Sequence, residues 1–177
     1  MTLRAVVLVE GESDRIAIET LATRRGRDFA AEGVAVVPIG GAQAIERALR
    51  SHVDVRVAGL YDIGERTAVL RGLERAGVAA DAFFACEPDL EGELVRALGP
   101  ERMLEVVETR GQLAAFTTYR KQPAKRAKPL EVQLHGWLHN WKVRYAAALV
   151  EALELDRVPP PLDGVLDAVS GSKQSSV

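Results

Sequence analysis

The hydrophobic pattern of the chain changes near residue 99. Before it, short unbroken apolar runs alternate with segments in which apolar residues recur every three or four positions. Short apolar runs bounded by turn residues predict buried strands, and the periodic segments predict helices. We therefore expect strands at Ala5–Val9, Val34–Ile39, Val53–Tyr61 and Ala82–Cys86. The predicted helices among them cover Arg15–Arg25, Ala42–Arg50, Glu65–Ala76 and Asp89–Leu98.

After Pro100 the strand patterns stop. Four more helices are predicted, at Met103–Val107, Leu113–Tyr119, Leu130–Leu138 and Val143–Leu153, and we interpret the Pro159–Pro161 run as a break in the helical pattern. Alternating strands and helices favour an α/β fold with a mostly parallel four-stranded sheet flanked by helices. We expect this domain at 1–99, a helical carboxyl-terminal extension packed on it at 100–169, and a frayed tail at 170–177.

The first strand ends in an acidic turn. Glu10 lies at its carboxyl end, the chain turns at Gly11, and Ser13 is expected to cap the next helix. Asp14 then falls in the first helical turn, where the helix dipole favours an anion. Glu10 and Asp14 are therefore predicted to converge at the mouth of the sheet, where open α/β sheets bind ligands.

Two later strands end in acidic residues as well. Asp62 and Glu65 follow the third strand, and Glu87, Asp89 and Glu91 follow the fourth. Because the carboxyl ends of parallel strands share one edge, we expect these side chains to lie close together. Carboxylates that close repel one another unless a cation lies among them. Mg²⁺ or Mn²⁺ suits carboxylate oxygens best. One or two such ions would support phosphoryl transfer.

A basic segment surrounds Pro123. It consists of Arg120, Lys121, Lys125, Arg126 and Lys128. Such a segment is either a solvated surface or, beside an acidic metal site, a grip on a nucleic-acid backbone. Lys142 and Arg144 lie in the first turn of a predicted helix, where positive charge is unfavourable for the helix dipole. Their position therefore indicates a role other than helix stabilisation. An ion pair of Lys142 with Glu131 or another acid stays open.

Other polar and aromatic residues are interpreted as structural. His135 and His139 have a spacing that could hold zinc, but surface or packing roles are favoured because no Glu follows His135. Trp137 and Trp141 are expected to pack within the extension, with base stacking as the alternative.

Composition narrows the class of protein. The chain has 177 residues, 47% of them hydrophobic, and a net charge of −2, so disorder is not expected and charge gives no global attraction to nucleic acid. Cys86 is the only cysteine, which excludes an intrachain disulfide and a cysteine zinc site. It is expected in the core. With no signal-like or membrane-length apolar segment, we expect a cytoplasmic protein that does not contact membranes.

The motif VEGESD, followed by a strand that ends in Asp, resembles the TOPRIM domain, a Rossmann-like Mg²⁺-binding module of topoisomerases, bacterial primases, recombination-repair proteins and OLD-family nucleases. The resemblance is closest to the OLD type, a bacterial-type family. LVEGESDRIAIETLA is similar to its first motif, YDIGE to its paired-Asp motif and PDLEGEL to its following acidic motif. WKVRYAAALVEAL and VPPPLDGVL are similar to its helical end.

The resemblance implies roles for individual residues. Glu10, Asp14, Asp62 and Glu91 would bind metal, and Asp89 is a further candidate. Glu65 and Glu87 are secondary candidates. Glu10 would also act as acid or base, and Lys142 would steady charge on the phosphate. Arg144 joins the basic segment as a candidate nucleic-acid contact.

The sequence departs from the OLD pattern in two ways. Gly64 stands where the paired motif has its second Asp, so one ligand is missing unless Glu65 replaces it. The ATPase domain that precedes TOPRIM in OLD proteins is not in this sequence, and an ATPase acting in trans and a homodimer stay open as partners.

Three functions remain in view. The first is a Mg²⁺- or Mn²⁺-dependent endonuclease or nucleotidyl-transfer enzyme, a hydrolase of phosphodiester bonds that acts on nucleic acid, with DNA favoured over RNA. The second is a catalytically weakened nucleic-acid-binding or regulatory module that works with a separate ATPase. A response-regulator receiver is disfavoured, because no fifth strand ending in Lys is found.

Overall fold

Four parallel strands form the centre of the molecule. The structure, a computed structural model, describes residues 2–170, so positions 171–177 of the predicted tail lie outside the described residues. The strands are β1 (Ala5–Val9), β2 (Val34–Pro38), β3 (Arg56–Asp62) and β4 (Phe83–Cys86), in the spatial order β2-β1-β3-β4. The α/β prediction is confirmed. Residues 53–55 are not part of β3, because the chain turns there before the strand begins.

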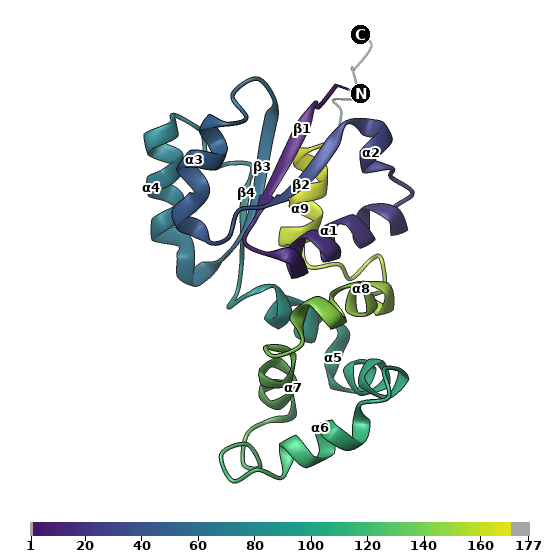
Figure 1. The fold of residues 1–177 in the computed structure, drawn as a ribbon. Helices are drawn as coiled ribbons and strands as arrows, with labels where there is room; N and C mark the ends of the chain where they lie inside the picture. Colours follow the sequence, from purple (N-terminus) through teal and green to yellow (C-terminus); the bar gives the residue numbers. More distant parts are fainter. Residues whose placement is uncertain (1, 171–177) are drawn as a thin grey trace.

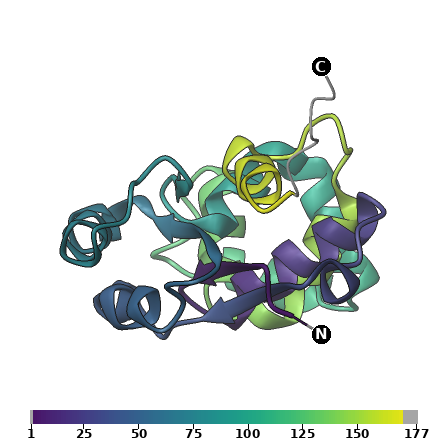
Figure 2. The same cartoon turned by 90° about the horizontal axis from the view of Figure 1, so that it is seen from above.

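Helices cover both faces of the sheet (Figure 2). The short 3₁₀ turn η1 (Ala42–Ala44), α3 (Ile45–Arg50) and α4 (Arg66–Ala76) pack on one face, against Val6 and Leu8. The alternate residues Val7 and Val9 face α1 (Glu12–Arg24) on the other side, near the short helix α2 (Phe29–Glu32). Both sets of β1 side chains are almost fully buried, which is why the first strand reads as a continuous apolar run.

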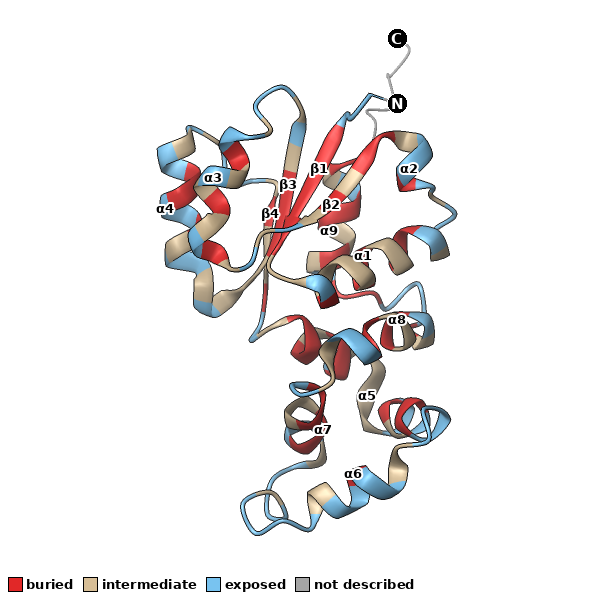
Figure 3. Cartoon of the chain, in the orientation of Figure 1, coloured by how far each residue is buried: buried red, intermediate tan, exposed pale blue. Residues whose placement is uncertain are grey.

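The helical extension begins at the carboxyl edge of the sheet (Figure 1). It contains α5 (Leu90–Thr109), α6 (Leu113–Arg120), α7 (Leu130–Leu138) and α8 (Lys142–Ala152). The predicted helices at 89–98 and 103–107 are continuous in α5 apart from a kink at Gly99, whose φ is +74°. The segment between α6 and α7, which carries the basic residues, is largely exposed (Figure 3).

A last helix, α9 (Pro160–Ala168), returns to the sheet and packs on β3 and β4. The interpretation of Pro159–Pro161 as a mere break in the helical pattern was therefore incomplete. Pro160 and Pro161 open α9, because proline suits the first positions of a helix, where the missing N–H is not needed. Leu162 and Val165 are fully buried, so α9 completes the second layer over the sheet.

Gly72 sets the distance between α3 and α4. A Cβ built at Gly72 would lie 2.1 Å from Ile45 Cγ2, a buried β-branched side chain with little freedom to move. We expect Gly72→Ala to lower the free energy of unfolding by about 1–2 kcal/mol, because overpacking outweighs the gain in helix propensity. Urea denaturation followed by circular dichroism measures this change.

Gly64→Ala is the matched control, because a Cβ there meets no atom within 4 Å and the backbone is not left-handed. If Gly72→Ala were as stable as Gly64→Ala, the close packing of α3 on α4 would not constrain position 72.

Candidate metal centre

The turn after β1 places two carboxylates at the carboxyl edge of the sheet. Glu10 is the first residue beyond the strand, and Asp14 lies in the first turn of α1. The N-cap of α1 is Gly11 and not the predicted Ser13, which lies inside the helix and is buried. Asp14 takes over the capping role, since its Oδ2 accepts a 2.8 Å hydrogen bond from the Gly11 N–H.

Asp62 and Glu65 come from the next strand in the sheet. Asp62 ends β3, and Glu65 lies in the 3₁₀ turn η2 (Ile63–Glu65) that follows it. Burial, reinforced by the negative charges of Glu10 and Asp14, raises the pKa of Asp62 to about 7. The Asp62 carboxylate therefore lies within electrostatic reach of both acids of the first turn.

The same repulsion acts on the first turn. The pKa of Glu10 is raised by burial and then by the charge of Glu65. Burial also raises the pKa of Asp14 to about 6, although its hydrogen bond from Gly11 opposes the change. At this edge burial and like charge both oppose ionisation of the carboxylates, and positive charge to offset them is scarce.

The cation that the structure does supply is Lys142. Its Nζ lies 2.7 Å from Oε2 of Glu91, whose residue is only 4% exposed. Burial lowers the pKa of Lys142, but the hydrogen bond to Glu91 and the nearby acids outweigh it and leave this pKa raised. Lys142 opens α8 and Glu91 lies in the first turn of α5, so the pair joins two helices of the extension at the acidic edge. The suggested partner Glu131 is not the one observed.

Asp89 is held by two donors. It is the N-cap of α5, where Oδ1 accepts a 2.8 Å hydrogen bond from the Gly92 N–H, and His135 Nε2 lies 2.8 Å from the same oxygen. The sequence analysis favours a structural role for His135, and no local pattern indicates this contact between residues 46 positions apart. The backbone N–H of Glu87 donates a 2.9 Å hydrogen bond to Oε1 of Glu93, a residue that the sequence analysis did not predict as part of the site.

The basic segment is organised by a buried amide. Gln133 is 3% exposed, and its Nε2 donates to the backbone oxygens of Lys125 and Lys128, at 3.0 and 2.9 Å. Its Oε1 accepts from Arg120 Nε, so Arg120 anchors the segment, while Lys121 and Arg126 extend into solvent. Gln133 was missed because one buried glutamine has no sequence signature.

Aromatic side chains fill the space between α6 and α7. Trp137 packs edge-on against Phe116 and Tyr119 and lies 6.0 Å from Trp141, between ring centroids, so Trp137 is a packing residue. The Arg144 guanidinium lies over the Trp141 ring, at 5.6 Å from its centroid. Cys86 is fully buried, and burial raises the pKa of its thiol, as expected for a core residue.

The donor set suits a hard divalent ion, because it is made of carboxylate oxygens that repel one another. Within residues 2–170, however, no three His, Cys, Asp or Glu side chains lie close enough together to hold an ion as they stand. Three of the carboxylates already have partners: Glu91 forms an ion pair with Lys142, Asp14 accepts a hydrogen bond from the Gly11 N–H, and Asp89 contacts His135. Ion binding would therefore require some of these side chains to exchange partners.

This fold and its acidic edge define a TOPRIM-type domain. Residues 3–63 match the family model described as "Overcoming lysogenization defect protein-like, TOPRIM domain". Residues 3–63 are therefore similar to OLD-like TOPRIM domains, and TOPRIM domains generally bind divalent metals. No curated protein matches the chain significantly.

Solved structures extend the likeness to the helical extension. The carboxyl-terminal region of the Burkholderia pseudomallei OLD protein is 19% identical, with a TM-score of 0.71, over 96% of this chain and 98% of that one. The corresponding region of the Xanthomonas campestris pv. campestris OLD protein is 22% identical, with a TM-score of 0.68, over 94% of each chain. At these identities the matches establish the fold. Over the described residues, no helix combines the length and apolar character needed to cross a bilayer.

Asp62 is expected to cost stability when no metal is bound. Its pKa rises from 3.8 to about 7 on folding, so the native state resists ionisation that the unfolded chain accepts. The penalty is absent below about pH 4, grows as the pH rises toward 7 and is constant above that. At about pH 8 in EDTA, Asp62→Asn should raise the free energy of unfolding by about 1–2 kcal/mol, after allowance for solvent screening.

Urea denaturation of both proteins across this pH range measures the effect. The two proteins should converge in stability at about pH 4. A variant that is equally stable or less stable at high pH would show that Asp62 is not strained by its acidic neighbours.

Proposed function

We propose that this protein is a Mg²⁺- or Mn²⁺-dependent nuclease that cleaves phosphodiester bonds of nucleic acid, with DNA as the expected substrate. One observation carries the proposal: acids from three strand ends share one edge of the sheet, and the pKa values of Glu10, Asp14 and Asp62 are all raised there. Stability alone does not favour such an arrangement, whereas metal-dependent phosphoryl transfer needs it.

The proposed roles follow from position. Glu10, Asp62 and Glu91 would hold the metal, with Asp14 and Asp89 as further ligands. A bound divalent ion would polarise the phosphate and lower the pKa of an attacking water. Glu10 has the additional role of acid or base, because its raised pKa brings it closer to working pH.

Lys142 fits a role at the phosphate. Its ammonium already lies among the acids, at Glu91, and is the positive charge in this position that could move to a substrate oxygen. Contact with phosphate would steady the charge that develops there and would free Glu91 as a ligand.

Glu65 is proposed to replace the second Asp of the paired motif. Gly64 offers no side chain, but Glu65 is the next residue, and its charge is the leading electrostatic influence on Glu10. A homodimer and a separate ATPase partner remain predictions.

Isosteric substitutions test the proposal. Glu10→Gln and Asp62→Asn should each lower the rate of Mg²⁺- or Mn²⁺-dependent plasmid cleavage by about 100-fold or more, because each removes a charged ligand or proton carrier without changing its size. Isothermal titration calorimetry should record correspondingly weaker Mn²⁺ binding. Since Asp62→Asn is expected to be the more stable protein without metal, its loss of activity would not reflect unfolding.

Glu74→Gln on the exposed face of α4 is the matched control and should cleave like the wild type. Equal cleavage by wild type, Glu10→Gln and Asp62→Asn would remove the proposed function.

A second candidate is a nucleic-acid-binding or regulatory module with weak chemistry. It is favoured by Gly64 and by the engagement of Glu91 with Lys142. Salt-sensitive DNA binding with no detectable Mg²⁺ or Mn²⁺ binding would select it over the nuclease.

The basic segment gives an independent prediction. Lys121→Gln and Arg126→Gln should each weaken DNA binding several-fold and reduce the slope of log K against log salt concentration by about 1, because each removes one phosphate contact. Fluorescence anisotropy at several salt concentrations measures both. Arg157→Gln, an exposed arginine between α8 and α9, serves as the control. Unchanged slopes for both variants would identify the segment as plain solvated surface.

A further inference from the structure

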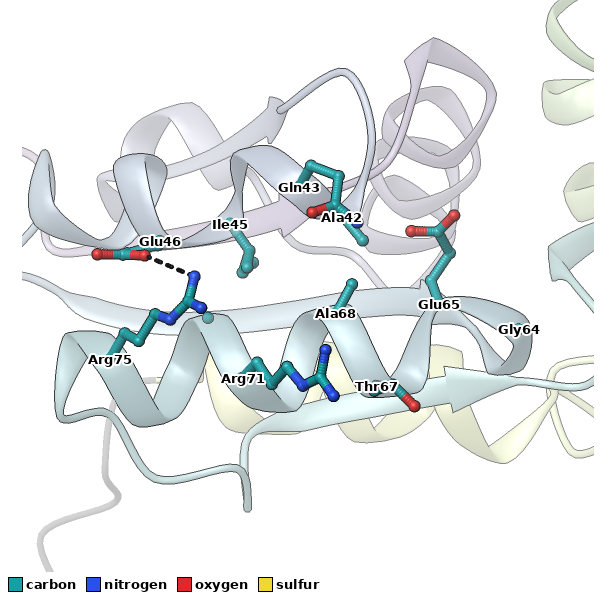
Figure 4. A pocket seen from close by; sticks show the side chains of 11 residues that line it. Ala42, Gln43, Ile45, Glu46, Gly64, Glu65, Thr67, Ala68, Arg71 and Arg75 are labelled. Carbon is teal, nitrogen blue, oxygen red and sulfur yellow. Dashed lines mark ion pairs between the residues drawn. The ribbon is translucent and has the colours of Figure 1, made fainter.

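A groove runs between α3 and α4, on the face of the sheet opposite α1 and α9 (Figure 4). Its volume is about 350 Å³, within the range of small-molecule sites. The groove shares only Glu65 with the acidic cluster, and no sequence pattern predicted it. Its floor is apolar, because Ala42, Ile45 and Ala68 line it and Gly72 lets the two helices approach closely.

The rim of the groove is polar and carries one available positive charge. Gln43 and Thr67 supply an amide and a hydroxyl. Arg75 is occupied, since its Nη1 lies 3.7 Å from Glu46 Oε2 (Figure 4). Arg71 is exposed and has no ion-pair partner among the described residues, and in Figure 4 its guanidinium lies along the groove between Arg75 and Thr67.

One end of the groove opens at the proposed metal centre. Glu65 lines this end and also lines a small neighbouring cavity together with Glu10, so the groove and the acidic edge are contiguous. The other end is closed electrostatically by the Glu46–Arg75 pair, and Arg50 also bonds Glu46 at 3.0 Å. A ligand that reaches the acidic edge can therefore continue past Glu65 to Arg71.

We propose that the groove holds one nucleotide unit of a single-stranded nucleic acid beside the bond that is cleaved. The assignment of a scissile bond rests on the proposed function, whereas binding of the strand does not. Arg71 contacts the backbone phosphate, and the apolar floor receives sugar or base. Gln43 and Thr67 lie where they can bond to polar edges of the base.

The size and the charge of the groove select this ligand. The volume accommodates a single nucleotide and not a base-paired duplex, and the free arginine matches the single negative charge of one phosphodiester. A strand that continues from the groove across the acidic edge would run toward the basic segment between α6 and α7, which belongs to the extension beyond that edge (Figure 1). A free nucleotide shares the same chemistry, so the experiment separates the two sources.

Binding of a labelled single-stranded oligonucleotide, measured by fluorescence anisotropy in EDTA so that the strand stays intact, tests the proposal. Arg71→Gln should weaken binding about three- to tenfold and lower the salt slope by about 1, because one phosphate contact is lost. Ala68→Leu keeps every charge but fills the floor, and it should weaken binding to a similar extent.

Arg47→Gln is the matched control. Arg47 is an exposed arginine on α3 that does not line the groove, so its loss should leave binding unchanged. Circular dichroism and urea denaturation check that each variant folds. Wild-type affinity in both Arg71→Gln and Ala68→Leu would overturn the proposal, and so would equal weakening by Arg47→Gln.

A competition arm identifies the source of the ligand. Nucleoside monophosphates should displace the oligonucleotide only at millimolar concentration, whereas displacement at micromolar concentration would overturn the strand in favour of a free nucleotide. The cleavage assay reports separately on the proposed function. If Arg71→Gln and Ala68→Leu weaken oligonucleotide binding but the wild type does not cleave DNA, the proposed nuclease activity is refuted and the groove proposal stands. If the wild type cleaves DNA but neither variant weakens binding, the groove proposal is refuted and the nuclease proposal stands.

Discussion

The structure is organised around an excess of negative charge at one edge of a parallel sheet. The parallel register of β1, β3 and β4 places their carboxyl ends side by side at one edge of the sheet. Acidic residues lie at or just after each of these ends. Lys142 compensates only part of this charge, through its bond to the buried Glu91. The remainder appears as raised pKa values at Glu10, Asp14 and Asp62. This cost in stability lies at the carboxyl edge of the sheet, which is where open α/β sheets bind ligands.

The extension depends on the same edge. α5 begins there at its Asp89 cap, α7 returns to it through His135, and α8 begins there with Lys142. These polar contacts place the helices that carry the basic segment next to the acids, while apolar residues such as Leu134 and Leu149 supply the burial. The polar contacts thus determine where the extension packs on the sheet, and the buried apolar side chains stabilise this packing.

The sequence was sufficient for the sheet, because β1 is buried on both faces and leaves an unbroken apolar run with acids at its end. It was also sufficient to identify the strand ends that carry Glu10, Asp62 and Glu91. It could not supply contacts that join distant segments. The bonds of His135 to Asp89 and of Gln133 to the basic segment depend on where α7 docks, which no local pattern encodes. α9 was missed because its opening prolines also suit a turn, and only the packed sheet face decides between the two.

The ion pair between Glu91 and Lys142 constrains how ligands would enter the proposed site. Glu91 is buried against Lys142, and breaking a buried ion pair without replacement is strongly unfavourable. A divalent ion alone would leave Lys142 unpaired among desolvated groups, and a phosphate alone would meet the repulsion of several carboxylates. Arriving together, the cation satisfies the acids while the phosphate satisfies the lysine. If the edge binds metal and nucleic acid as proposed, its electrostatics favour coupled binding of the two over binding of either one first.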